Sequence, residues 1–238
     1  MTKSLLIRYL IVILKFFLLI PGAAMAESST YVAFGVGVVD LNPEVLKGLR
    51  AAGGAGSVSQ DLLDQALNSS TEALEDQNFA VTGYVGRAFT VRDFPVALEL
   101  EALWSQGENL TAEADVENET LSIFVNVRIP AFGFRELVKA IPLCSSCEVF
   151  YRGGFGAAYV QQSLFSSIAS FDFEEWQDAY HAGGGITIPV TKRLSVEGHI
   201  RRLFVTDLEF RGAINDEPFA ASERFPTVQF LGTVRFAI

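Results

Sequence analysis

Apolar and polar residues alternate with a period of two along several segments of this 238-residue chain. That period predicts β-strands that have one apolar and one polar face. Glycine, proline and other turn residues separate the segments, and no long apolar helix is expected after the first 26 residues. We predict eight strands, near residues 30–41, 79–91, 95–106, 116–130, 148–163, 178–190, 194–208 and 225–238.

Four of these segments define their two faces clearly. In "VALELEALW" the apolar residues share one face, and Glu99 and Glu101 share the other. In "LSIFVNVRI" an apolar face opposes a face that carries Asn126 and Arg128. The polar faces of the last two strands carry Ser195, Glu197, His199, Arg201, Thr227, Gln229, Thr233 and Arg235. The segments 30–41 and 79–91 are rich in glycine and do not define a face.

The connections between the predicted strands also alternate. Long loops at 42–78, 107–115, 164–177 and 209–224 alternate with tight turns near residues 92–94 and 191–193, and with a longer connection at 131–147. Long loops at one end and short turns at the other are typical of transmembrane up-and-down barrels. Closure matters there, because an open sheet edge in lipid would leave backbone groups unpaired. The predicted fold class is all-β, an eight-stranded antiparallel up-and-down transmembrane β-barrel with a polar, charge-paired interior.

Within the loop 42–78, Leu62, Leu63, Ala66 and Leu67 follow helical spacing, and Ser59 is a candidate N-cap. A short helix that covers the barrel mouth fits this pattern. A binding surface or a plug fits it as well.

The first 26 residues predict export from the cytoplasm. A charged start, an apolar run and the small residues "AAMA" are typical of a secretory signal peptide. We therefore expect residues 1–26 to be removed and residues 27–238 to form the barrel domain. An uncleaved membrane anchor is the alternative, although Arg8 and Lys15 interrupt the apolar run.

Charge and cysteine content narrow the function further. Three of the 18 Lys and Arg lie in the signal segment and all 28 Asp and Glu lie after it, so the remaining chain has a formal charge of −13. Such an acidic chain is a poor candidate for binding nucleic acid.

The two cysteines, Cys144 and Cys147 in "CSSC", favour a local disulfide over a thioredoxin-like redox pair, because they follow Pro142 and precede a strand. Neither a metal site nor a cofactor is expected.

The stretch "LSVEGHIRRLF", residues 194–204, allows two interpretations. Glu197, His199 and Arg201 share one face, which fits an acid–base site and also fits the wet inner wall of a barrel. Strands rise about 3.3 Å per residue, so distances from the turns predict the depth of each charge. This places Glu99, Arg128, Arg152, Glu197 and Arg235 in one layer near the turn end, and Glu101, His199 and Arg201 in the next layer.

An eight-stranded barrel has an interior that side chains just fill, and charges inside it must pair. The three carboxylates and four guanidinium groups of these layers are nearly balanced. The sequence therefore predicts a closed ionic network and leaves little room for a porin-like channel.

Three stretches carry a resemblance to a known family. They are "YRGGFGAAYV", "GGGITIPVTKRLSVEGHIRRLF" and the closing "FPTVQFLGTVRFAI", together with the signal ending "AMA". They resemble the opacity-type and outer-membrane-protein-A-type eight-stranded barrels of Gram-negative bacteria. The resemblance implies an outer-membrane location, insertion by the barrel assembly machinery, contact with outer-membrane lipid and lipopolysaccharide, surface-exposed loops and no catalysis.

Three functions follow as hypotheses. The first is a small non-enzymatic outer-membrane barrel that supports envelope integrity or presents the loops 42–78, 107–115, 164–177 and 209–224 to host or surface ligands. The second is a barrel enzyme that modifies lipid A, of the deacylase type, which needs a nucleophile, a base and an orienting group within hydrogen-bond reach. The third is a soluble lipocalin-like barrel, which would place its apolar face inward and its charges outward.

Overall fold

The computed structural model describes residues 29–41, 78–92, 94–110, 114–131, 146–166, 169–214 and 217–238. These residues form eight β-strands. They are β1 (Ser29–Leu41), β2 (Asn78–Val91), β3 (Phe94–Leu110), β4 (Ala114–Pro130), β5 (Glu148–Ser166), β6 (Ala169–Pro189), β7 (Leu194–Ile214) and β8 (Glu217–Ala237). Among the described residues, no helix has the length and hydropathy needed to span a membrane. The predicted signal peptide, the predicted helix in the loop 42–78, and Cys144 lie outside the described residues.

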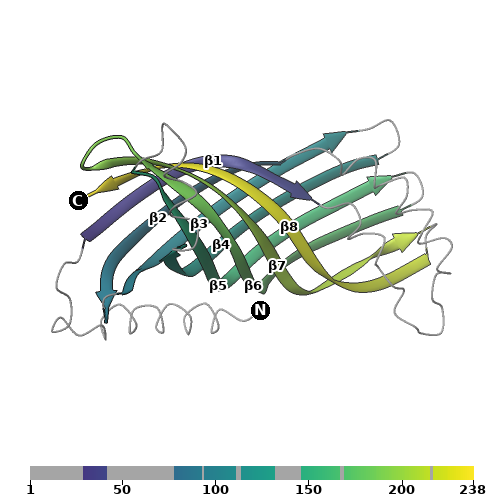
Figure 1. Ribbon diagram of the computed structural model, residues 1–238. Helices are drawn as coiled ribbons and strands as arrows, with labels where there is room; N and C mark the ends of the chain where they lie inside the picture. The colour runs from purple at the N-terminus through teal and green to yellow at the C-terminus, as the bar shows by residue number, and fades with distance from the viewer. Residues whose placement is uncertain are drawn as a thin grey trace.

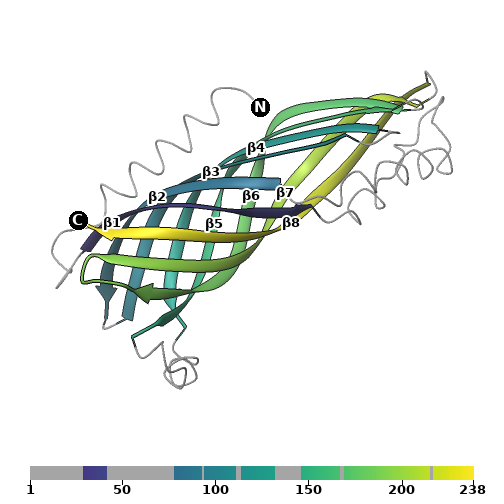
Figure 2. The ribbon, with the colours of Figure 1, turned by 90° about the horizontal axis from the view of Figure 1, so that it is seen from above.

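The strands form one closed antiparallel barrel in chain order, and β1 closes it by pairing with β8. Figures 1 and 2 show the strands wrapping around a common axis at a strong tilt, with the C-terminus at the same end as the β6–β7 turn. Thr191 shapes that turn, since its hydroxyl accepts a hydrogen bond from the backbone N–H of Leu194 at 3.0 Å. The backbone N–H of Ile238 donates to the carbonyl of Thr30 at 2.9 Å, so the chain end is fixed to the first strand. The predicted fold class is confirmed.

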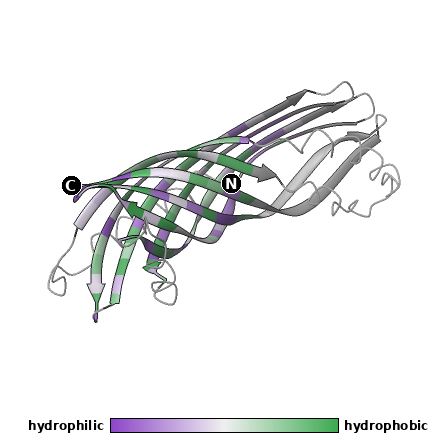
Figure 3. Cartoon of the chain, turned by 45° about the horizontal axis from the view of Figure 1, so that its top comes forward, coloured by the Kyte–Doolittle hydropathy of each residue, from purple (hydrophilic) through white to green (hydrophobic). Residues whose placement is uncertain are grey.

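The two faces of the wall have opposite chemistry. Apolar side chains project outward and are exposed, among them Phe34, Val36, Val85, Val127, Phe155, Ile200, Phe230 and Val234. Polar and charged side chains point inward and are buried, among them Thr82, Ser122, Asn126, Thr187, Gln229 and Thr233. The alternation of hydrophobic and hydrophilic residues is visible along the strands in Figure 3. A lipocalin-type barrel needs the reverse arrangement, so the structure contradicts that alternative.

The strands are longer at the loop end than the alternation predicts. The sequence predicts loops at 107–115, 164–177 and 209–224, but the strands continue to Leu110, Ser166 and Ile214 and resume at Ala114, Ala169 and Glu217. Two register shifts explain part of the error. One lies between Asp172 and Ala179 in the β6–β7 ladder, and the other between Val205 and Leu208 in the β7–β8 ladder. A β-bulge adds a residue to one strand of a pair, so the period of two is interrupted locally on the strand that carries it.

Candidate functional site

The lower layer of charges, nearest the turns, is centred on Glu197 of β7. Its Oε1 atom lies 2.7 Å from Nη1 of Arg128 on β4 and 3.0 Å from Nη1 of Arg235 on β8. The hydroxyl of Tyr84 donates a hydrogen bond to Oε2 of the same carboxylate. Thr187 adds a fourth partner, since its hydroxyl donates to Oε1 at 3.0 Å. One buried carboxylate therefore joins five strands across the lumen.

Glu99 is the second carboxylate of the lower layer. Its Oε2 atom lies 2.6 Å from Nε of Arg152 on β5, and the hydroxyl of Tyr31 donates to its Oε1 at 2.7 Å. The rings of Tyr31 and Tyr84 meet edge to face, with their centroids 6.3 Å apart. The two tyrosines therefore connect the carboxylates of β3 and β7 through β1 and β2. Hydrogen bonds to ionised groups are among the stronger ones in proteins.

The upper layer is centred on Glu101, which is fully buried. Its Oε2 atom lies 2.7 Å from Nη1 of Arg201 and 3.5 Å from Nη2 of Arg152. Asn126 donates to the same oxygen at 2.7 Å, and the hydroxyl of Thr82 donates to Oε1 at 2.8 Å. Arg152 contacts Glu99 as well, so it joins the two layers.

Aromatic rings cover the guanidinium groups. Arg128 lies 3.9 Å from the ring centroid of Phe150, and Arg152 lies 4.3 Å from that of Tyr84. Cation–π contacts of this kind favour arginine, whose planar cation is weakly hydrated. The rings also fill the lumen around the ion pairs, so the pairs are shielded from water.

The two histidines differ in their contacts. His199, which is 6% exposed, has no hydrogen-bond partner at either ring nitrogen within the described residues. Nε2 of His181 lies 2.8 Å from Oδ1 of Asn126 and 3.4 Å from Nη1 of Arg201. His199 is therefore a lumen residue next to the network, whereas His181 is part of it.

This geometry does not assemble a nucleophile and a base. An acid–base site at His199 would need Glu197 or a hydroxyl to contact the imidazole. Glu197 is instead committed to Arg128 and Arg235. The hydroxyl of Ser195 accepts a hydrogen bond from Nε of Arg235 at 3.2 Å. Within the described ranges, no group of three His, Cys, Asp or Glu side chains is placed to hold a metal ion.

The residues predicted for the interior all face the lumen. The structure joins seven of them by ion pairs: Glu99, Glu101, Arg128, Arg152, Glu197, Arg201 and Arg235. His199 lies beside them, and neither of its ring nitrogens has a polar partner among the described residues. The disulfide between Cys144 and Cys147 stays a prediction, because Cys144 lies outside the described residues.

The sequence pattern gives no role to several members of the network, among them Tyr31, Thr82, Tyr84, Asn126, His181 and Thr187. Tyr31, Tyr84 and His181 lie on strands whose glycines hide the alternation, and Asn126 was assigned to the polar face without a role. A signal was present in the sequence. Tyr84 and Gly86 share parity in "VTGYVGRAF", and a tyrosine among glycines on an inward face has space around its ring.

Comparisons with known proteins identify the fold. No protein-family model matches the sequence, and no curated protein matches it. Among solved structures, a major outer membrane protein from Thermus thermophilus matches with a TM-score of 0.54 and 8% identity, over 89% of this chain and 100% of that one. Neisserial surface protein A matches with a TM-score of 0.47 and 7% identity, over 88% and 98% of the two chains. OprG from Pseudomonas aeruginosa matches with a TM-score of 0.41 and 10% identity, over 89% and 97%. The match to the Thermus thermophilus protein and the eight strands of the closed barrel show that the chain has the fold of an eight-stranded outer-membrane barrel, as the resemblance implies.

Proposed function

We propose that this chain is a non-enzymatic outer-membrane β-barrel of a Gram-negative bacterium, which supports envelope integrity as a closed structural unit. The observation that carries the proposal is the ionic network across the lumen, in which Glu197 and Glu101 each contact two arginines. A network of this kind fills the space that a pore would need. The apolar outer face supports a position in lipid.

The alternative of a lipid-A-modifying enzyme has less support. All three carboxylates of the lumen network contact arginines, and His199 lacks an orienting partner among the described residues. The network therefore offers ionised groups that stabilise one another and no carboxylate base that is free to accept a proton. Presentation of the loops to surface ligands is compatible with the structural role.

Two experiments test this proposal. The first expresses the full chain in a Gram-negative host, fractionates the cells and compares the electrophoretic mobility of the membrane fraction with and without boiling. We expect the protein in the outer-membrane fraction, with a mobility that changes on heating. A protein found in the soluble periplasm would contradict the proposal.

The second experiment separates a closed barrel from a pore and from an enzyme. We expect purified barrels in planar bilayers to show no steady conductance, because the ionic network obstructs the lumen. We also expect the mass of lipid A from the expressing cells to equal that from cells that carry an empty vector. If lipid A from the expressing cells lacks an acyl chain, and lipid A from cells that express a His199→Ala variant keeps it, the protein is an enzyme.

A further inference from the structure

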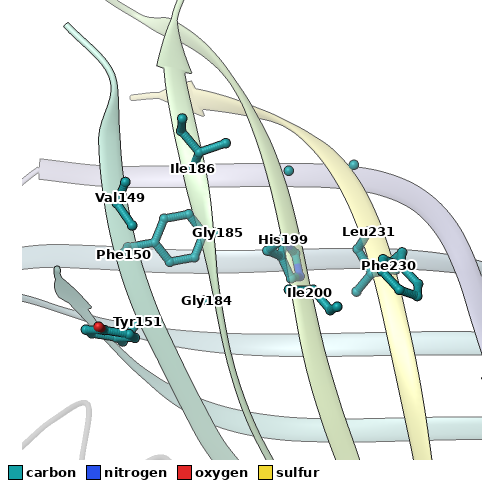
Figure 4. A pocket seen from close by; sticks show the side chains of 12 residues that line it. Val149, Phe150, Tyr151, Gly184, Gly185, Ile186, His199, Ile200, Phe230 and Leu231 are labelled. Atoms are coloured by element: carbon teal, nitrogen blue, oxygen red, sulfur yellow. The ribbon is translucent and has the colours of Figure 1, made fainter. Parts of the chain in front are cut away.

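The lipid-facing wall has an open apolar depression across β5, β6, β7 and β8, with a volume of about 790 Å³. Figure 4 shows the side chains that surround it. Outward-facing residues line it, among them Tyr151, Ile186, Ile200 and Phe230, and the buried, inward-facing Phe150, His199 and Leu231 lie at its base. Gly198 and Gly232 also line it, and they are direct partners in the β7–β8 ladder.

The chain itself does not require glycine at these two positions. A Cβ atom at Gly198 would meet no atom within 4 Å, and at Gly232 the nearest contact would be the carbonyl oxygen of Val36 at 3.9 Å. Neither glycine has a left-handed backbone conformation. In contrast, a Cβ atom at the inward-facing Gly35 or Gly183 would lie 2.3 or 2.2 Å from a backbone oxygen. Glycine inside a strand lowers its stability and often marks a site that another molecule approaches closely.

A cation lies above the depression on the same face. Arg202 is exposed and follows Gly198 by four residues on β7, which is about 13 Å along the strand. Its guanidinium group lies 5.2 Å from the ring centroid of Phe204, toward the loop end. Phe204 stacks on Tyr180, with centroids 5.0 Å apart. Aromatic rings beside a cation are typical of the membrane–water interface. Among the described residues, Arg202 has no carboxylate partner.

We propose that the depression and Arg202 form a binding site for one molecule of lipid A, the phosphorylated lipid of the outer leaflet. An acyl chain occupies the space above Gly198 and Gly232, and a phosphate group of the same molecule pairs with Arg202. The chain gains van der Waals contacts with the apolar residues that line the depression, and the phosphate supplies the selectivity. This inference rests on the proposed location in the outer membrane with the loops outside.

The experiment uses the full barrel domain, refolded from inclusion bodies in neutral detergent so that no bacterial lipid is carried over. Lipid A is added in increasing amounts, and native mass spectrometry counts the molecules that stay bound to each barrel. We expect one retained lipid A in the wild type. Arg202→Gln should lower its apparent affinity about fivefold, the effect of removing one cation near a lipid phosphate. Gly198→Leu and Gly232→Leu should abolish retention, because the leucine side chain fills the depression.

Matched controls keep the result specific. Val127→Leu enlarges an outward side chain on β4, and Arg193→Gln removes a cation at the turn end; both should retain lipid A like the wild type. Each variant must show the wild-type mobility change on boiling, which tests the barrel separately from the lipid site.

Equal retention in the wild type, Gly198→Leu and Arg202→Gln would overturn the inference. Equal retention of phosphatidylglycerol would overturn the assignment to lipid A, and a wild-type dimer that Gly232→Leu dissociates would assign the depression to a second copy.

Discussion

The two halves of the barrel lumen are both polar, but among the described residues the buried ion pairs all lie in the half near the turns. In the half near the turns, three carboxylates, four arginines and two tyrosines contact one another. In the half near the loops, several buried polar atoms have no hydrogen-bond partner among the described residues. They belong to Asn78, Asn118, Ser122, Gln162 and Thr227.

This difference shows which half fixes the barrel. Removing one partner of a buried ion pair leaves a charge without compensation, so the turn-side half is sensitive to single substitutions. No buried ion pair lies in the described part of the loop-side half, so a substitution there leaves no charge uncompensated, and we expect that half to tolerate substitution better. We therefore assign the closed structure to the turn-side network.

Substitution of a network carboxylate should have the largest effect. Glu197→Ala leaves Arg128 and Arg235 without their shared anion, and Glu99→Ala removes the closest anion from Arg152. We expect each to lower the free energy of unfolding by about 3–5 kcal/mol and to lower the unfolding temperature. Urea unfolding in lipid vesicles, followed by the fluorescence of Trp104 and Trp176, measures this change.

An exposed carboxylate provides the control for those variants. Glu174 accepts a hydrogen bond from Tyr159 on the outer face, and Glu174→Ala should change stability by less than about 1 kcal/mol. If Glu197→Ala and Glu99→Ala both unfold like the wild type, the lower layer of charges does not stabilise the barrel.

Arg201→Lys should have an intermediate effect. Arg201 donates to Glu101 from Nη1 and to Gln229 from Nε, and the single ammonium group of lysine keeps the positive charge but cannot replace both donors. We expect a loss of about 2–3 kcal/mol in the same unfolding assay. A lysine variant as stable as the wild type would show that charge alone, without the geometry of the guanidinium group, supports the upper layer.

Removal of one hydroxyl should have a smaller effect. Tyr84→Phe keeps the ring under Arg152 but removes the hydrogen bond to Glu197. We expect a loss of about 1.5 kcal/mol, and Tyr31→Phe offers the matched change at Glu99. No change in either variant would mean that the arginines alone hold these carboxylates.

Removal of a loop-side hydroxyl should have the smallest effect. The Oγ atom of Ser122 is buried without a hydrogen-bond partner among the described residues, so Ser122→Ala should change the free energy of unfolding by less than about 0.5 kcal/mol. A loss as large as that of Tyr84→Phe would remove the distinction between the two halves.

The sequence predicts the turn-side half well and the loop-side half poorly, for a physical reason. Alternation is strict where one face of a strand meets lipid and the other meets a charged lumen, so the pattern assigns Glu99, Arg128 and Glu197 to the inward face. Tight turns near residues 92 and 192 then fix the depth of Glu99 and Glu197, since each is a few residues from its turn.

Alternation gives less information where its cause is absent. The glycines of β1, β2 and β6 have no side chain to mark a face, so Tyr31, Tyr84 and His181 were missed. The two register shifts in the β6–β7 and β7–β8 ladders interrupt the period locally, so the sequence pattern predicts loops at residues where the structure has strands. Partners across the lumen, such as Tyr84 for Glu197, depend on how the barrel closes, which no local pattern records.

The most direct test of the central claim is a double-mutant cycle between Arg128 and Glu197. Unfolding free energies are measured in the same vesicles for the wild type, Arg128→Met, Glu197→Leu and the double variant. The two side chains contact each other at 2.7 Å inside the lumen. We therefore expect the double variant to lose less unfolding free energy than the two single variants lose together, by about 1–3 kcal/mol. Losses that add to within about 0.5 kcal/mol would contradict a barrel held closed by paired charges.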